Sequence, residues 1–133
     1  DFFINTRSMM EMNYDVIKSY FDFIHEYLIQ DGYFLNINRY EKIIAGVPIR
    51  IAEYPYDANW KVLISKPSFS QKHIHQLLTK RVSNPSLGNI NEELNSISKI
   101  GAKYYLSKKQ IISLFIYEKF ILRIKKMLKR FLF

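Results

Sequence analysis

The residues best suited to chemistry in this sequence are polar side chains that directly follow two short apolar runs. The first group is Asn5, Thr6, Ser8 and Glu11, and the second is Asn36, Asn38 and Arg39. A carboxylate such as Glu11 can act as a general base, and a guanidinium such as Arg39 can bind a phosphate or a carboxylate. The same residue types also cap helices or simply lie in solvent, and that alternative stays open for each of them.

One strand–helix–strand unit is expected to position these groups. FFINT at 2–6 is apolar on both faces, as buried parallel strands are. Asn13 or Asp15 can cap a helix that continues to Leu28, and Gly32 is expected to end it in the left-handed conformation. Residues 33–38 read as the second strand. Because the carboxyl ends of parallel strands meet at one edge of a sheet, the polar groups are expected together there.

The remaining sequence predicts further elements. We expect a short helix or loop at 40–46, strands at 48–54 and 60–65 joined by PYDAN, and a helix at 71–81. Helices are also expected near 91–100 and 107–130. The predicted fold class is α/β, with parallel strands and a closing hairpin over 1–81, a linker at 82–91 and a helical tail at 92–133.

The composition excludes several kinds of site. The chain has no cysteine, so disulfides, thiolate zinc sites and a cysteine nucleophile are excluded. Its three histidines, His25, His73 and His75, are too poorly placed for a metal cluster, and no metal site is expected. On the predicted helix His73 and His75 point in different directions, and His75 is a candidate general base.

The net charge of +8 is concentrated in the last 26 residues. Residues 108–133 hold eight Lys and Arg against Glu118, whereas the first 107 residues are nearly neutral. A body that binds nucleic acid would spread a basic surface over the fold. The charge distribution therefore argues against a nucleic-acid partner, although a small basic nucleic-acid-binding protein remains an alternative function.

The basic segment has the pattern of an amphipathic helix. On a helical wheel one third of the circumference is basic, and the opposite side is apolar; the basic residues are Lys119, Arg123, Lys126, Lys129 and Arg130. Charged residues recur too often for a membrane span. The pattern suits the surface of an anionic bilayer, or equally a helix that packs on the body. A membrane-peripheral interaction module is thus a further alternative function. The expected localisation of the protein is cytoplasmic, with attachment at the inner face of the cytoplasmic membrane as an open alternative.

A succession of short motifs carries a family resemblance. Asn5–Thr6–Arg7–Ser8, Glu11–Met12, GYFLNINR at 32–39, EYP at 53–55, Trp60 and Gln71–His75 follow one another along the chain. In this order they resemble the sugar O-methyltransferases of bacterial surface-polysaccharide loci, which have a Rossmann-like fold and use S-adenosylmethionine. The resemblance covers roughly residues 1–81. It implies that 1–6 and 33–38 correspond to the fourth and fifth strands of such a sheet, with 49–54 and 60–65 closing it.

The resemblance also implies roles for the polar residues. Asp1, Asn5 and Thr6 would bind S-adenosylmethionine; Ser8, Asn38 and Arg39 would bind a sugar or lipid-linked saccharide; Glu11 and His75 would be catalytic. The family's glycine-rich loop and acidic ribose-binding residue have no counterpart in this sequence. We therefore expect the C-terminal half of such an enzyme, inactive alone, with an incomplete cofactor site. We also expect self-association through the exposed edge of strand 1–6.

Overall fold

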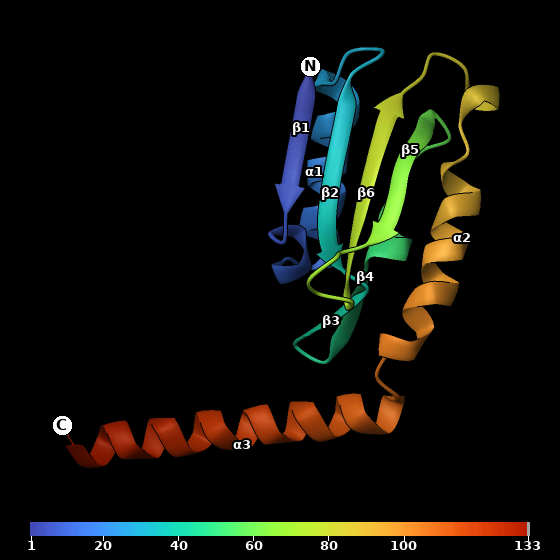
Figure 1. The fold of residues 1–133 in the computed structure, drawn as a ribbon. Coiled ribbons are helices and arrows are strands. Elements are labelled where there is room, and N and C mark those ends of the chain that lie inside the picture. Colours follow the sequence, from blue (N-terminus) through green and yellow to red (C-terminus); the bar gives the residue numbers. More distant parts are fainter. Residues whose placement is uncertain (133) are drawn as a thin grey trace. The chain divides into compact units, whose positions relative to one another are not determined.

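The computed structural model describes the backbone of residues 1–132 and the side chains of residues 1–129. The chain forms two compact units, one made of residues 1–44 and 48–105, the other of residues 45–47 and those from 106 onward. The first unit contains a mixed four-stranded sheet with helices, and the second contains one long helix (Figure 1). The fold is therefore mixed α/β with a helical tail.

The predicted strand–helix–strand unit is confirmed. Strand β1 (Phe2–Thr6) and strand β2 (Tyr33–Arg39) pair in parallel, and helix α1 (Tyr14–Tyr27) connects them. The Asn13 side chain caps α1 by accepting a hydrogen bond from the Val16 amide at 2.9 Å. The role given to Gly32 was wrong, because Asp31 takes the left-handed conformation, with φ 66°. Gly32 instead leaves room for the backbone, since a Cβ there would lie 2.9 Å from the Ile29 carbonyl oxygen.

The sheet has the strand order β1-β2-β6-β5, in which β6 (Ile74–Arg81) runs antiparallel to β2 and to β5 (Trp60–Pro67). The prediction of a helix at 71–81 was therefore wrong. The spacing of Ile74, Leu77 and Leu78 fits a helix, but a short apolar run does not distinguish a helix from a strand. Residues 74–81 form a strand because they pair with β2 on one side and with β5 on the other.

Residues 40–54 also differ from the prediction. Strands β3 (Glu41–Ile44) and β4 (Val47–Arg50) form a two-stranded sheet, and a short 3₁₀ helix, η2 (Ile51–Glu53), follows. Both residues of the connecting turn have positive φ, 49° at Ala45 and 82° at Gly46, as a tight two-residue hairpin requires. The expected loop or helix at 40–46 was thus wrong, and the strand expected at 48–54 is a strand only as far as Arg50. The hairpin that closes the main sheet is β5–β6.

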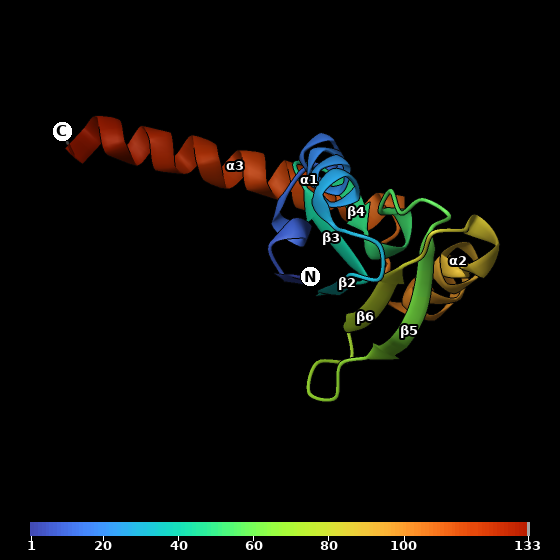
Figure 2. The same ribbon diagram turned by 90° about the horizontal axis from the view of Figure 1, so that it is seen from above.

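Helices α1 and α2 (Ile90–Gly101) pack on the same face of the main sheet (Figure 2). The core between them includes the fully buried Phe21 of α1, Ile97 of α2 and Trp60 of β5. The expected helix near 91–100 is confirmed, but it belongs to the body. The proposed linker at 82–91 contains the 3₁₀ turn η3 (Pro85–Leu87) and packs against β5, so the first unit continues to Tyr105, past the expected boundaries at 81 and 92.

Helix α3 (Lys108–Leu132) confirms the helix expected at 107–130. Large apolar side chains on it are exposed, among them Ile116 at 62 %, Tyr117 at 63 % and Phe120 at 59 %. The side chains of Arg130, Phe131 and Leu132, which the sequence placed on the two sides of this helix, lie outside the described residues. Within the described part of the chain, no helix is long and apolar enough to span a membrane.

Candidate functional site

Three buried asparagines form a hydrogen-bonded network at the carboxyl ends of β1 and β2. Asn5 of β1 faces the helices, as do Asn36 and Asn38 of β2. The Asn38 amide donates to Asn5 Oδ1 at 2.9 Å and to Asn36 Oδ1. The Asn36 amide in turn donates to the Tyr56 hydroxyl at 3.1 Å. Each amide thus has partners inside the protein, as buried polar groups require.

This network holds the short 3₁₀ turn η1 (Met9–Glu11) in place. The backbone amide of Met10 donates to Asn38 Oδ1 at 3.1 Å, and that of Met9 to Asn5 Oδ1 at 3.4 Å. Asn5 Nδ2 also donates to Ser8 Oγ at 2.5 Å. The two methionine side chains are buried beneath the turn. The asparagines therefore act on the turn, and the turn carries Glu11.

Glu11 is the accessible carboxylate at this end of the sheet. Its side chain is about half exposed and forms an ion pair with Lys42 of β3, with an Nζ–Oε1 distance of 3.1 Å. The exposure of the side chain leaves its second carboxylate oxygen accessible to a ligand. Glu11 can therefore accept a hydrogen bond from a ligand hydroxyl, or take up its proton.

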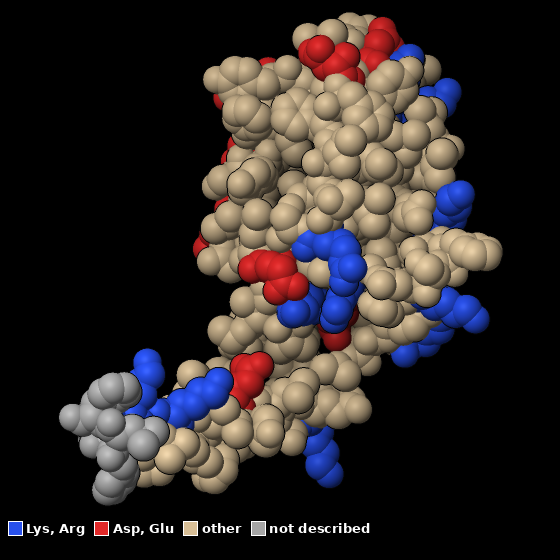
Figure 3. All heavy atoms as spheres, turned by 60° about the vertical axis from the view of Figure 1, so that its left-hand side comes forward, with Lys and Arg blue, Asp and Glu red and all other residues tan. Residues whose placement is uncertain are grey.

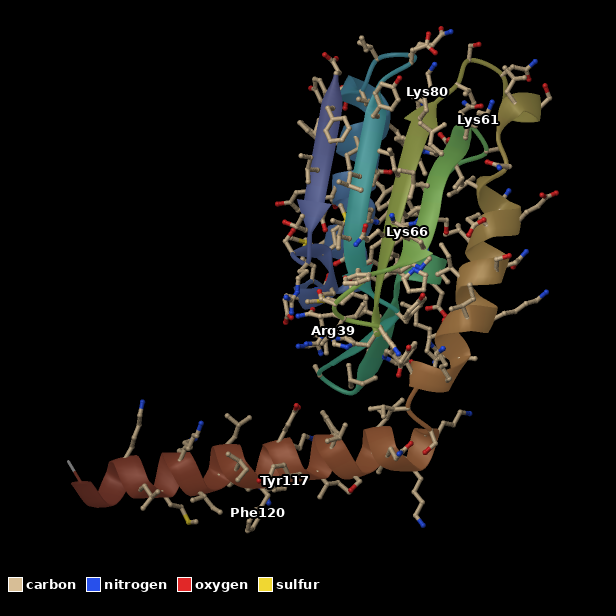
Figure 4. The ribbon with its side chains drawn as sticks, viewed as in Figure 1. Arg39, Lys61, Lys66, Lys80, Tyr117 and Phe120 are labelled. Atoms are coloured by element: carbon tan, nitrogen blue, oxygen red, sulfur yellow. The ribbon has the colours of Figure 1, made fainter. Side chains whose placement is uncertain are left out.

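The opposite face of the sheet, which we call the open face, is arranged in three rows set by the strand register. Across the strand order the rows are Phe2–Tyr33–Lys80–Lys61, then Ile4–Leu35–Leu78–Ile64, then Thr6–Ile37–Gln76–Lys66. An apolar row thus lies between two rows that end in lysines. Arg39 follows the third row on β2, and Figure 4 shows it near the end of that strand.

Arg39 is a cation of the open face whose guanidinium is not fully paired within the described residues. Its Nε is buried and has no hydrogen-bond partner within residues 1–129. By comparison, Lys80 on the same face forms an ion pair with Asp31 at 2.8 Å. The Arg39 side chain as a whole is only partly buried, and a guanidinium at this position can bind a carboxylate or a phosphate.

The fold separates charges that alternate along the sequence. In Figure 3 acidic groups lie along the left and top outline of the body, while Lys and Arg project along the right outline. Three acidic residues belong to α1, whereas Arg39, Lys61, Lys66 and Lys80 lie on the open face. The body is nearly neutral in sum, yet one face of it is basic.

His75 lies in a second buried chain of polar groups. Its Nδ1 is 2.9 Å from the Tyr40 hydroxyl, and its Nε2 is 2.8 Å from Ser65 Oγ. The Ser65 hydroxyl uses its single hydrogen in a bond to Glu93 Oε1 at 2.5 Å, so it can only accept from His75. The imidazole therefore carries its hydrogen on Nε2, which donates to Ser65, and its Nδ1 accepts a hydrogen bond from the Tyr40 hydroxyl. Burial lowers the pKa of His75 to about 4 and raises that of Tyr40 to about 12. The imidazole is therefore neutral, and both its nitrogens are engaged.

The structure brings together only some of the residues that the sequence indicated. Asn5, Ser8 and Asn38 are joined by hydrogen bonds, and Glu11 follows them on the same turn. Thr6 and Arg39 lie at the same edge but on the open face. His75 lies in strand β6 and is fully buried, so it does not reach a ligand and the prediction that it is a general base was wrong.

Asp1 is separated from this group. It precedes β1, at the amino end of the strand, where its carbonyl accepts a hydrogen bond from the Tyr33 amide at 3.0 Å. Parallel sheets place ligands at the opposite end. No group of three or more His, Asp or Glu side chains within the described residues is arranged to hold a metal ion.

Several residues of these sites were not indicated by the sequence, among them the four that follow. They are Lys42, Ser65, Gln76 and Glu93. Lys42, Ser65 and Glu93 form ion pairs or hydrogen bonds with residues 10 to 31 positions away, and Gln76 lies beside Ile37 of another strand. None of them has a local signal, because IHQLLT at 74–79 does not alternate between apolar and polar residues. Comparisons with protein-family models, with curated proteins and with solved structures find no match to this chain.

Proposed function

We propose that this chain provides the acceptor-binding part of an S-adenosylmethionine-dependent O-methyltransferase that acts on a sugar hydroxyl, in the synthesis of a bacterial surface polysaccharide. One observation carries the proposal: polar groups gather at the carboxyl ends of two adjacent parallel strands, the position at which α/β sheets bind ligands. The parallel β1–β2 pair beside a closing antiparallel hairpin supports a Rossmann-like origin of the sheet.

The residues have separate roles in this proposal. The Glu11 carboxylate accepts the proton of the sugar hydroxyl as its oxygen attacks, and the asparagine network holds Glu11 on its turn. Arg39 binds an anionic group of the acceptor, such as a uronic acid carboxylate or a sugar phosphate. The acceptor is therefore an acidic saccharide, free or linked to a lipid.

The residues expected to hold S-adenosylmethionine do not fit it in this structure. Both polar atoms of the Asn5 side chain are engaged within the protein, and Asp1 lies at the wrong end of its strand. Only Thr6 of the three remains exposed at the correct edge. We therefore assign to residues 1–132 the binding of the acceptor and the removal of its proton, and no contact with the cofactor.

Binding of glucuronic acid and of glucose, measured by isothermal titration, tests the proposal. The acid should bind, glucose should bind at least tenfold more weakly, and Arg39→Gln should abolish the difference, because a charge-assisted bond contributes about 1.5–3 kcal/mol. Lys61→Gln, on the same face at the other end of the sheet, is the matched control and should bind like the wild type. Equal affinity for both sugars, or loss in the control alone, would refute the role of Arg39. Saturable binding of S-adenosylmethionine would refute the assignment of the cofactor to other residues.

A specific observation favours a second candidate function, attachment of α3 to an anionic membrane surface. Tyr117 and Phe120 extend from the same side of α3 and are exposed (Figure 4). The basic residues Lys119, Arg123 and Lys126 lie on a different side of the helix. Such a helix binds lipid through its apolar side, while each basic group near an anionic surface adds about 1 kcal/mol.

Co-sedimentation with vesicles of phosphatidylglycerol and phosphatidylcholine tests this function. The triple variant Lys119→Gln, Arg123→Gln and Lys126→Gln should lose roughly 100-fold in affinity for anionic vesicles, from about 1 kcal/mol per charge. The matched triple variant Lys61→Gln, Lys66→Gln and Lys80→Gln removes the same charge from the open face and should bind normally. If both triple variants lose the same affinity, attachment depends on total charge and α3 is not the membrane-binding element.

A further inference from the structure

The two edges of the main sheet differ in how they are covered. At the β5 edge, the amide of Val62 donates to Asn89 Oδ1 at 2.7 Å, the Asn89 amide donates to the Trp60 carbonyl at 3.1 Å, and a β-bulge follows Val62. Such devices prevent further strand pairing. Strand β1 is the other edge, and among the described residues it pairs on one side only, with β2. Figure 1 shows β1 at the left end of the sheet with α1 behind it.

The backbone of β1 offers a regular set of outward hydrogen-bonding groups. The Asp1 carbonyl accepts from the Tyr33 amide, and the Arg7 amide donates to the Ile37 carbonyl, so odd-numbered residues bond to β2. In a parallel pair the bonding residues alternate along a strand. The N–H and C=O groups of Phe2, Ile4 and Thr6 therefore point outward, with Ile4 at the centre of the five-residue strand.

An apolar stripe on α1 lies on the same side as this edge. Val16, Tyr20, Phe23 and Tyr27 are 40–57 % exposed and follow one another at helical spacing. Phe23 packs against Phe3 of β1, with ring centroids 6.0 Å apart, which locates the stripe beside the β1 edge. A shallow apolar hollow of about 370 Å³ lies along it. The strand edge and the stripe thus form one continuous surface, which we call the β1–α1 surface.

We propose that the β1–α1 surface binds a second copy of this chain around a two-fold axis. Antiparallel pairing of β1 with its symmetry mate places Ile4 opposite Ile4 and Phe2 opposite Thr6, and the outward groups of all three residues then pair. Because the axis is perpendicular to the sheet, both α1 helices stay on one face and their stripes meet. A single two-fold axis therefore pairs the outward backbone groups of β1 and covers the apolar stripe of α1.

The size of the surface fits a weak dimer. Aromatic side chains carry about 150–250 Å² each, so the exposed parts of the stripe and of β1 amount to on the order of 1,000 Å² for two copies. This lies near the lower limit of roughly 1,200 Å² for stable interfaces, to which the strand hydrogen bonds add. We accordingly expect a dimer that dissociates on dilution.

A charge swap at Ile4 tests the two-fold arrangement. Ile4 is 62 % exposed and its backbone bonds point away from β2, so Ile4→Lys and Ile4→Glu should each leave the fold intact. Light scattering after size exclusion at about 50 µM, a concentration suited to a weak interface, should give a dimer for the wild type and a monomer for each variant. Like charges then face each other across the axis, and mixing the two variants should restore a dimer. Position 3 would not give this test, because Phe3 packs against Phe23.

Two further measurements complete the test. Ile64→Lys, on the same face but on β5, should dimerise like the wild type. Amide hydrogen exchange of the wild type should show Phe2, Ile4 and Thr6 protected at high concentration and exposed on dilution, which decides the question even if a variant fails to fold. A monomeric wild type, unchanged association of the Ile4 variants, or a mixture that stays monomeric would each overturn the proposal. Unchanged association would instead indicate contacts elsewhere, such as the apolar side of α3.

Discussion

Removal of the Asn38 side chain should destabilise the body much more than its size suggests. Asn38→Ala removes the hydrogen-bond partner described for two buried groups. One is the Met10 amide, which donates to Asn38 Oδ1 at 3.1 Å in the wild type, and the other is Asn36 Oδ1, which accepts from the Asn38 amide. Each buried polar group left unsatisfied costs about 1–3 kcal/mol, so the free energy of unfolding should fall by about 3–5 kcal/mol. Small domains have about 5–15 kcal/mol in total. The variant should therefore fold but unfold at a much lower urea concentration.

Urea unfolding followed by tryptophan fluorescence measures this change. Trp60 is the single tryptophan of the chain and is fully buried in the same unit, so its emission reports on unfolding of the body. Asn13→Ala is the matched control, because it removes an exposed helix cap and should cost about 1 kcal/mol. The urea midpoint should shift with an unchanged slope. If Asn38→Ala costs no more than Asn13→Ala, the asparagine network does not support the turn that carries Glu11.

Three further outcomes are expected in the same assay. Burial lowers the pKa of His75 from 6.5 to about 4, so between pH 6.5 and pH 4 the unfolded chain binds a proton that the folded chain does not. The free energy of unfolding should therefore fall as the pH falls through this range. His75→Gln should remove on the order of 3 kcal/mol of this pH dependence. An identical pH profile in the variant would contradict the burial of a neutral imidazole. Gly88→Ala should cost about 2 kcal/mol or more, because its Cβ would lie 1.9 Å from the Ala58 carbonyl oxygen. A neutral result would mean that Gly88 does not pack against the backbone of Ala58 and Trp60. Ile97→Ala in α2 should cost about 2–5 kcal/mol and Ile116→Ala in α3 less than about 0.5 kcal/mol, since the first is fully buried and the second 62 % exposed; similar losses would show that α2 and α3 belong to one cooperative unit.

The contrast between α1 and β6 shows which parts of the fold are predictable. Helix α1 has a cap at Asn13, directly before its first residue, and an apolar face at regular spacing, and both signals are local in the sequence. Strand β6 has the same kinds of residues as a short helix, and it becomes a strand because β2 and β5 pair with it from both sides. The hairpin β3–β4 depends on positive φ at Ala45 as well as Gly46, which an alanine does not signal.

The sequence by itself determined that β1, α1 and β2 form a parallel unit, that polar groups follow its strands, and that the basic residues concentrate in a long terminal helix. Only the tertiary structure decided that Asn5 and Asn38 bond to each other inside the body while Arg39 lies on the other face with its Nε unpaired. It likewise decided that His75 is buried between Tyr40 and Ser65. The physical reason is that helix and strand patterns arise from neighbours a few residues apart, whereas the partners of a buried polar group come from strands brought together by folding.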